Sequence, residues 1–317
     1  MTTTLGRPST AGGAPSSGRP PEQTSTGQPP DRWAEGGVTV AVQRRLRLLA
    51  ASVALTVLAF VQAPGRIAPD TKLDLSVDPL GFLLRAWNLW EPLGASGQLQ
   101  NQAYGYFIPM GPFYLVGNVL GFPAWIVQRA WWALVLVVAF HGMYRLLGRM
   151  GVGIHSTQLI AALAYALSPR MITELGPVSI EAWPIAMAPW VLLPLIRVTP
   201  GGEATAAARS GLAIALCGGV NAVAVGAVLP LPVWWLITRE KSAMRRKLAR
   251  WWAVAAVCAT LWWLGPLLLL GRYSPPFLDW VESSAVSTSK ASLPGAFRGT
   301  TQWVAWFQLP DPIWLAG

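Results

Sequence analysis

The apolar stretch LRLLAASVALTVLAFVQA (46–63) runs directly into the polar stretch PGRIAPDTKLDLSVD (64–78). As a helix, the first stretch would cover about 27 Å at about 1.5 Å per residue, which is enough to cross most of a bilayer core. An ionised side chain inside lipid costs roughly 2.5 to 3.5 kcal/mol on the gentlest scale. We therefore predict a membrane helix followed by a loop that lies outside the bilayer core and whose charged side chains have a function. Three carboxylates and one ammonium group fall within nine residues of this loop: Asp70, Asp74, Asp78 and Lys72.

The composition extends this prediction to the whole chain. Apolar residues make up 53% and charged residues only 12% of the 317 residues, whereas soluble domains contain about 25% charged residues. The apolar residues occur in long blocks separated by short polar segments. This pattern predicts an all-α integral membrane protein, with about five to eight helices in one bundle.

The net charge of +10 does not indicate a nucleic-acid partner. The basic residues form short clusters between apolar runs rather than one continuous face, which is the pattern that the positive-inside rule produces. The densest cluster, 239–250, is predicted to face the cytoplasm, where contact with anionic membrane lipid or an acidic protein is the alternative to a purely topological role. Neither cysteine nor histidine occurs at the spacing of a zinc site, so no metal ligands are predicted.

Three regions are expected along the chain. Residues 1–30 contain 21 Gly, Pro, Ser or Thr. Such a segment has too few apolar side chains to offset the entropy lost on ordering, so a disordered cytoplasmic tail is predicted over 1–40. A transmembrane bundle is predicted over 41–271 with an external loop at 64–104, followed by a periplasmic segment at 272–317 that begins a larger region. The expected crossings lie at 46–63, 124–147, 180–197, 211–237 (two short helices turning near 218–221) and 251–271, with interfacial or re-entrant pieces at 80–90 and 105–121.

With the tail inside, this topology places 16 basic residues on the cytoplasmic side and 8 outside. The asymmetry supports a multi-pass protein of the plasma membrane with its polar loops on the external face. No internal repeat is visible, and the charges gather at an outer rim rather than at the membrane midplane. Both observations favour a membrane enzyme over the main alternative, a carrier or transporter of lipid-linked sugars.

The external loops hold the residues that a transferase with a lipid-phosphate donor requires. One carboxylate must accept the proton of the attacking hydroxyl, and cations must offset charge on the departing phosphate. Solvated carboxylates and snorkelling cations are the structural alternatives. The candidates are Asp70 and Asp74 as catalytic carboxylates, Lys72, Arg129 and Arg170 as donor-phosphate ligands, and Asn101, Gln102, Tyr104, Glu181, Asp279 and Glu282 for sugar binding.

Six ordered segments resemble the AftD-type alpha-(1→3)-arabinofuranosyltransferases of actinobacteria, which are GT-C glycosyltransferases. They are PDTKLDL (69–75), QNQAYGYFIPMGPF (100–113), QRAWWALVL (128–136), AYALSPR (164–170), EAWPIAMAPWVLLPL (181–195) and YSPPFLDWVESSAVSTS (273–289).

The resemblance implies a GT-C bundle with its site on the periplasmic face, a decaprenylphosphoryl-arabinofuranose donor and an arabinan acceptor. It also implies an inverting reaction whose catalytic acid lies in the first external loop, which maps to Asp70, with Asp74 second. Family members are much longer, so this chain is expected to be an N-terminal portion, and an inactive glycan-binding module is a further alternative. A divalent cation is left open as a cofactor.

Overall fold

A computed structural model describes residues 32–68, 70, 72–92, 97–99, 102–220, 222–273 and 292–298, with side chains from residue 41 onward except that of Gln98. The chain divides into two compact units, 1–43 and 44–317. Helix α1 (Arg32–Phe60) begins in the first unit, so residues 32–40 are helical rather than part of the predicted tail. No proline lies between Pro30 and Pro64, and the absence of this helix breaker explains the length of α1.

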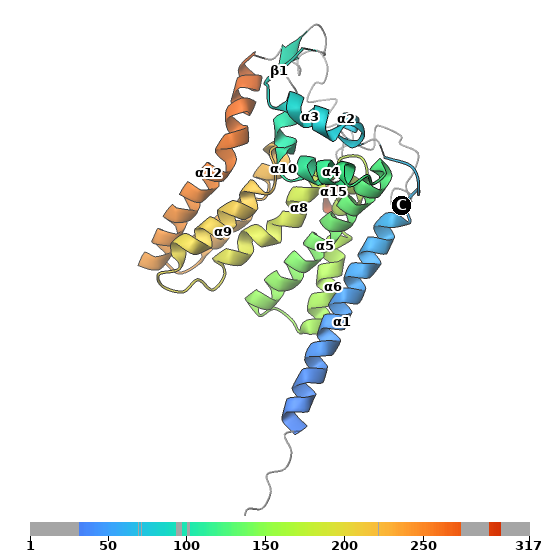
Figure 1. Ribbon diagram of the computed structural model, residues 1–317. Helices are drawn as coiled ribbons and strands as arrows, with labels where there is room; N and C mark the ends of the chain where they lie inside the picture. The colour runs from blue at the N-terminus through green and yellow to red at the C-terminus, as the bar shows by residue number, and fades with distance from the viewer. Residues whose placement is uncertain are drawn as a thin grey trace, which may run out of the picture. The chain divides into compact units, whose positions relative to one another are not determined.

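Helix α5 (Ala124–Met150) is the centre of the second unit. It packs against α6 (His155–Ala166) and α8 (Ser179–Leu192), and Figure 1 shows α5, α6 and α8 close together. Trp131, Leu136 and Phe140 on α5 are fully buried, so this helix supplies much of the core.

A second pair of helices, α9 (Glu203–Ala215) and α12 (Ala243–Tyr273), forms the largest helix–helix contact. A β-carbon added at Gly211 would lie 2.8 Å from the β-carbon of Ala255, so glycine permits this close approach. Among the described residues, α5 and α12 are the two helices that are long and apolar enough to cross a membrane.

Two predicted crossings are broken helices. The stretch 180–197 forms the 14-residue α8, with Pro184 and Pro189 inside it, and then the short 3-10 helix η2 (Leu193–Leu195). In the stretch 211–237 the predicted break is confirmed, because Gly218 adopts φ +84° between α9 and α10 (Ala222–Gly226). However, α9 begins eight residues earlier than expected, and α11 (Pro230–Thr238) is a separate helix.

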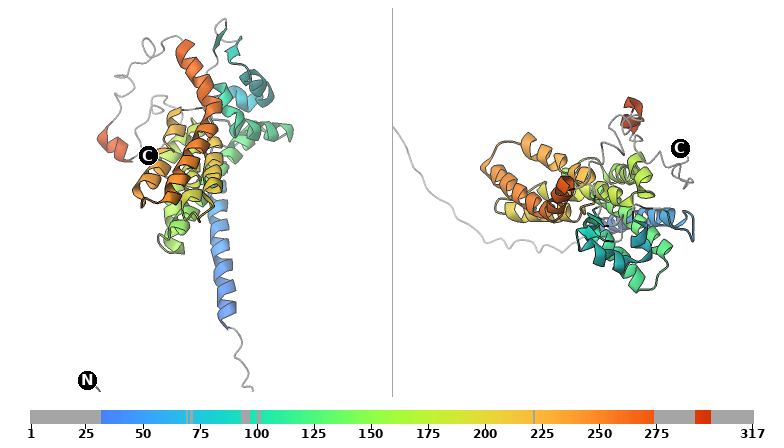
Figure 2. Two further views of the ribbon diagram at one scale, coloured as in Figure 1. Left: turned by 90° about the vertical axis from the view of Figure 1, so that its left-hand side faces the viewer. Right: turned by 90° about the horizontal axis from the view of Figure 1, so that it is seen from above.

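Short elements cover the end of the bundle near the first loop (Figures 1 and 2). They include a two-stranded antiparallel hairpin that the sequence did not predict, in which Trp90 pairs with Leu99. The elements are α2 (Leu73–Val77), α3 (Pro79–Ala86), β1 (Trp90–Glu91), β2 (Gln98–Leu99), η1 (Ala103–Phe107), α4 (Met110–Val119) and α7 (Pro169–Leu175), while α15 (Leu293–Arg298) follows much later in the chain.

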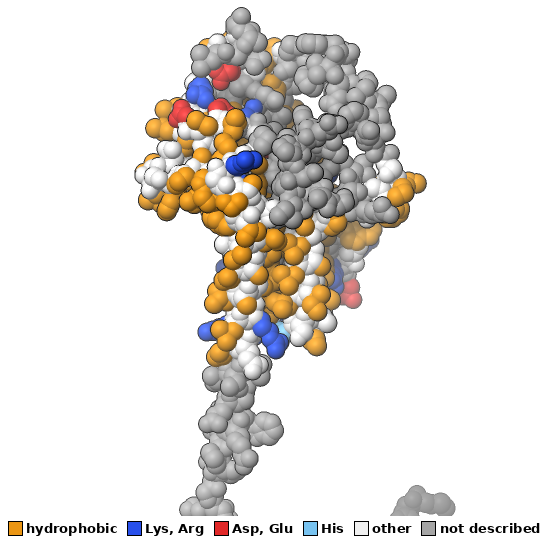
Figure 3. Space-filling view, turned by 90° about the vertical axis from the view of Figure 1, so that its right-hand side faces the viewer, with side chains coloured by type: hydrophobic (Ala, Val, Ile, Leu, Met, Phe, Trp, Pro, Cys, Tyr) orange, Lys and Arg blue, Asp and Glu red, His pale blue; other side chains and the backbone are white. Residues whose placement is uncertain are grey.

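Large apolar side chains remain exposed on the outside of the bundle. Leu80, Leu84 and Trp87 of the α3 segment are exposed, as are Val257 and Leu261 on α12. Figure 3 shows apolar side chains over most of the described surface of another face, with basic side chains and a histidine at its lower end. An apolar surface of this extent is typical of a chain solvated by lipid rather than by water.

Candidate active site

The first loop after α1 is held by Gln128 and Arg129, which are adjacent on α5. The Gln128 amide accepts a hydrogen bond from the backbone N–H of Ala68 (2.8 Å) and donates one to the carbonyl of the same residue (3.0 Å). Arg129 Nε donates to the carbonyl of Gln62 (2.9 Å), and its Nη2 donates to the carbonyl of Arg66 (3.0 Å). These bonds satisfy carbonyls left open beyond the end of α1 and fix the path of the loop.

Arg129 therefore has a structural role that its position in the sequence did not reveal. Its side chain is 1% exposed, lies over the ring of Trp132 at 4.0 Å from the centroid, and donates from Nη1 to Gln128 Oε1 (2.8 Å). The predicted role of Arg129 as a phosphate ligand stays a prediction, and the contacts in the structure indicate that it positions the loop.

Asp70 lies at the end of this anchored loop and is only 8% exposed. The hydroxyl of Ser179, in the first turn of α8, donates a hydrogen bond to Asp70 Oδ2. Ser179 in turn accepts a hydrogen bond from Trp131 Nε1 (3.1 Å) on α5. The chain Trp131–Ser179–Asp70 thus joins two core helices to the loop, and it orients one oxygen of the carboxylate.

Tyr114, on α4, completes the surroundings of Asp70. It is 2% exposed, and burial raises the pKa of its hydroxyl well above the ordinary value, with the nearby charge of Asp70 raising it further. Tyr114 therefore stays neutral in the electrostatic field of the Asp70 carboxylate.

A second acidic group lies at the junction of α7 and α8. The side chain of Glu174 is fully buried, and its Oε1 is 2.7 Å from Nη2 of the half-exposed Arg170. Glu174 Oε2 has no hydrogen-bond partner among the described residues. Burial raises the pKa of Glu174 to about 7, and the charge of Glu181 adds to the rise while Arg170 opposes it. The carboxyl group of Glu174 consequently changes its protonation state near neutral pH.

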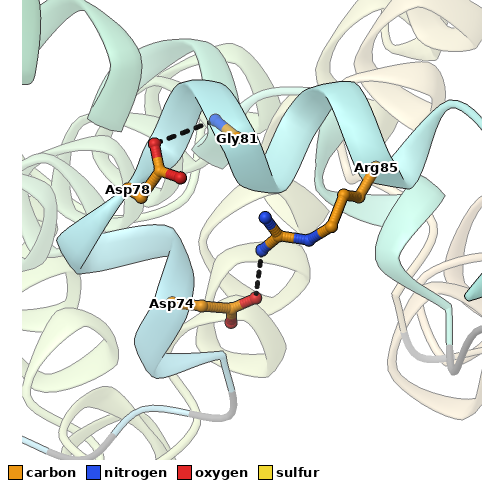
Figure 4. A network of polar contacts seen from close by, with 4 residues as sticks. All are labelled: Asp74, Asp78, Gly81 and Arg85. Atoms are coloured by element: carbon orange, nitrogen blue, oxygen red, sulfur yellow. Dashed lines mark hydrogen bonds and ion pairs between the residues drawn. The ribbon is translucent and has the colours of Figure 1, made fainter. Parts of the chain in front are cut away.

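Figure 4 shows the contacts of the other two loop carboxylates, Asp74 and Asp78. Asp74, on α2, forms an ion pair with Arg85 of α3 at 3.2 Å, and both side chains are partly exposed. Asp78 caps the N-terminus of α3 by accepting a hydrogen bond from the backbone N–H of Gly81 (3.0 Å), a favourable use of an aspartate. Lys72 is half-buried and immediately precedes α2.

The predicted sugar-binding residues are only partly described. Gln102 adopts a left-handed conformation with φ +57° before η1, and the hydroxyl of the buried Tyr104 has no hydrogen-bond partner among the described residues. Burial raises the pKa of Tyr104 to about 12, so it is neutral. Asn101, Asp279 and Glu282 lie outside the described residues, and Glu181 is in the first turn of α8. No group of three or more His, Cys, Asp or Glu within the described ranges is arranged to hold a metal ion.

Comparison with known proteins assigns the chain to a family. A protein-family model for the alpha-(1→3)-arabinofuranosyltransferase N-terminal GT-C domain, of the AftD type, matches residues 54–317. The chain belongs to the AftD GT-C family. Its α5 and α12 helices and this GT-C membership together identify it as a membrane protein.

Individual AftD relatives agree with this assignment. The alpha-(1→3)-arabinofuranosyltransferase of Mycolicibacterium smegmatis is 49% identical over 255 residues, and that of Mycobacterium tuberculosis is 49% identical over 259 residues. A cryo-EM structure of the arabinofuranosyltransferase AftD from mycobacteria superimposes with a TM-score of 0.73 at 43% identity over 82% of this chain. The two sequence matches cover 80% of this chain, which spans only 18% of each relative and 20% of the solved chain.

Sequence reasoning selected Asp70 but missed the residues that hold it. Ser179, Trp131 and Gln128 lie more than 50 residues away in sequence, inside apolar stretches. One signal was available, since the adjacent polar residues Gln128 and Arg129 near the start of an apolar helix require partners. The burial of Glu174 had no comparable signal, because it depends on how α7 packs.

Proposed function

We propose that this chain forms the catalytic N-terminal part of an inverting arabinofuranosyltransferase. Its donor would be a polyprenyl-phosphate-linked arabinofuranose of the decaprenyl type, and its acceptor a cell-wall arabinan that gains an alpha-(1→3) linkage. The observation that carries the proposal is the placement of Asp70. It is a buried carboxylate in the first loop after the first helix, with one oxygen fixed by Ser179.

In the proposed reaction Asp70 acts as the general base. It accepts the proton of the acceptor hydroxyl while the hydroxyl oxygen attacks the anomeric carbon. The bond between that carbon and the phosphate oxygen breaks, and the electron pair leaves with the polyprenyl phosphate on the opposite face of the sugar. The phosphate is a good leaving group, so the base is more necessary than a general acid.

Cations near the site would offset the charge on the departing phosphate. Arg170 fits this role because its guanidinium is half-exposed, while the buried Glu174 fixes one of its nitrogens at 2.7 Å. Lys72 is half-buried on the same loop as Asp70 and is the second candidate. Asp74 is a weaker candidate for the base, since its carboxylate is exposed and paired with Arg85.

The external face of the plasma membrane is the proposed location of the site. Asp70 and the α7–α8 junction are associated with the Gln128–Arg129 end of α5, whereas Arg145 and Arg149 mark the other end of the helix. The positive-inside rule assigns the second end to the cytoplasm. Asn101, Gln102, Tyr104, Glu181, Asp279 and Glu282 remain proposed contacts for the sugars, and a divalent cation remains open.

The experiment is transfer of labelled arabinose from synthetic polyprenylphosphoryl-arabinofuranose to a short arabinan acceptor. It compares this chain and a version extended to the length of its relatives, each as wild type, Asp70→Asn and Asp74→Asn. We expect Asp70→Asn to lose activity while remaining folded, and Asp74→Asn to retain most of it. Full activity of a folded Asp70→Asn variant would overturn the assignment of the base. Glycan or lipid binding without transfer by the extended wild type would instead support a carrier or a binding module.

A further inference from the structure

An open cavity of about 630 Å³ lies at the end of the bundle opposite Asp70, and it is lined by basic side chains from separate parts of the chain. They come from α1, from the C-terminal end of α5, from the start of α6, from the segment after η2 and from α9. None of the described residues that line the cavity is a carboxylate. The basic lining residues are Arg44, Arg145, Arg149, Arg197 and Arg209, together with His155.

None of these five guanidinium groups forms an ion pair within the described part of the chain. The ion pairs there are Arg85 with Asp74, Arg170 with Glu174, and Lys247 with Glu203, and none involves a residue of the cavity. Like charges gathered around one cavity repel one another unless an anion offsets them. The cavity therefore has the electrostatic character of an anion site.

Several of the arginines are held in place by neighbouring groups. Arg44 lies over the ring of Tyr144 (5.6 Å to the centroid), and Arg145 lies over Trp190 (4.9 Å). Arg149 Nε donates to the carbonyl of Ile196 (3.2 Å), which leaves both of its Nη groups available. Planar guanidinium groups that are already oriented match the geometry of phosphate oxygens better than mobile ammonium groups do.

The position along α5 indicates where the anion would come from. Arg145 is sixteen residues beyond Arg129 on the same helix, or about 24 Å along its axis. That distance is close to the thickness of a hydrocarbon core, so the cavity lies at the headgroup level of the leaflet away from Asp70.

A neighbouring cavity of about 550 Å³ shares Arg149 and Arg197 with the first. Its lining adds apolar side chains, among them Ile196, Leu236 and Trp235, and also the charged residues Arg239, Glu240 and Arg245. We infer that the arginine-lined cavity binds the phosphate of an anionic membrane lipid whose hydrocarbon part extends over this apolar lining. The inference is independent of the proposed transferase activity, because it uses none of the residues around Asp70.

The test is native mass spectrometry of the purified chain titrated with phosphatidylglycerol, with phosphatidylcholine as the zwitterionic comparison. The variant is Arg44→Gln/Arg145→Gln/Arg209→Gln. The matched control, Lys241→Gln/Arg246→Gln/Arg250→Gln, removes the same charge from exposed residues that line neither cavity. Each basic side chain near an anionic headgroup favours binding by a similar amount, about fivefold in affinity. The loss of three such side chains should therefore weaken phosphatidylglycerol binding on the order of a hundredfold. The control should change it by less than about fivefold.

Two further arms make the result decisive. A variant with lysine at the same three cavity positions keeps the charge but not the guanidinium geometry, so it should bind phosphatidylglycerol more tightly than the glutamine variant and less tightly than wild type, which separates loss of the site from loss of the fold. Inorganic phosphate at millimolar concentration should not displace the lipid, and displacement would assign the cavity to a free phosphate. Unchanged phosphatidylglycerol binding in the folded glutamine variant, or equal losses in variant and control, would overturn the inference.

Discussion

The hydroxyl of Ser179 donates a hydrogen bond to Oδ2 of Asp70, although the two residues are 109 positions apart in the sequence. One is in the first turn of α8 and the other is in the loop after α1, and both are buried. A carboxylate that is fixed at one oxygen presents the other oxygen in a defined direction. The geometry suits a base that must meet a hydroxyl held by another molecule.

Ser179→Ala tests this relationship. We expect the transfer rate of an active, extended form of the protein to fall by about 10- to 100-fold, because misplacement of a reacting group by about 1 Å can cost about 100-fold in rate. The matched control is Ser210→Ala. Ser210 is also fully buried, accepts a hydrogen bond from Trp252 Nε1 (3.0 Å) and donates one to the carbonyl of Val191 (2.7 Å). Equal losses of activity in the two variants would show a general effect on stability rather than positioning of Asp70.

Glu174 predicts a pH dependence of stability. Its pKa rises from the ordinary value of 4.5 to about 7 in the folded protein, so between these pH values the folded state binds a proton that the unfolded state has released. The free energy of unfolding should therefore fall as the pH rises through this window, by about 1 to 3 kcal/mol.

Glu174→Gln should remove this decrease, as measured by thermal unfolding in detergent at a series of pH values. Glu240→Gln is the control, because Glu240 is exposed and its loss should leave the decrease in place. A wild-type slope in Glu174→Gln would contradict the assignment.

Arg129→Gln separates a structural role from phosphate binding. Loss of the guanidinium leaves the carbonyls of Gln62 and Arg66 without their donors, at an expected cost of about 2 to 4 kcal/mol. Faster hydrogen exchange should follow in residues 61–68. Arg66→Gln is the control, since the side chain of Arg66 is exposed in the same loop. Unchanged loop protection together with a raised KM for the donor would instead favour the phosphate-ligand prediction.

Gly105→Ala tests the contact between η1 and the turn after α9. A β-carbon at Gly105 would lie 2.4 Å from the backbone of Gly219 and of Val220, and the backbone N–H of Gly219 donates to the carbonyl of Gly105 (3.3 Å). We expect a loss of about 1 to 3 kcal/mol from the forced separation. Gly271→Ala on α12 meets no atom within 4 Å and should be neutral or slightly stabilising, because alanine favours a helix. Equal melting temperatures for the two variants would show that this approach is not tight.

The sequence alone determined the class of the protein and the location of its first loop. Long apolar blocks with few charges can be stable only as helices in lipid or in a core, and the break at Gly218 follows from the conformational freedom of glycine. Six segments in a fixed order were likewise enough to indicate the family, because their joint presence in one chain is specific. The end of α8 was not predicted. The apolar stretch 180–197 was expected to form one helix, whereas α8 contains Pro184 and Pro189 and ends at Leu192.

The tertiary structure alone decided which charged residues share an environment. Asp70 and Asp74 are the same residue type in the same loop, but the first is buried and bonded to Ser179 of α8, while the second remains exposed and paired with Arg85. The same is true of Arg129, whose partners are backbone carbonyls that no side-chain pattern records. Burial and hydrogen bonding depend on contacts between segments far apart in the chain, and a local pattern of residues contains no information about those contacts.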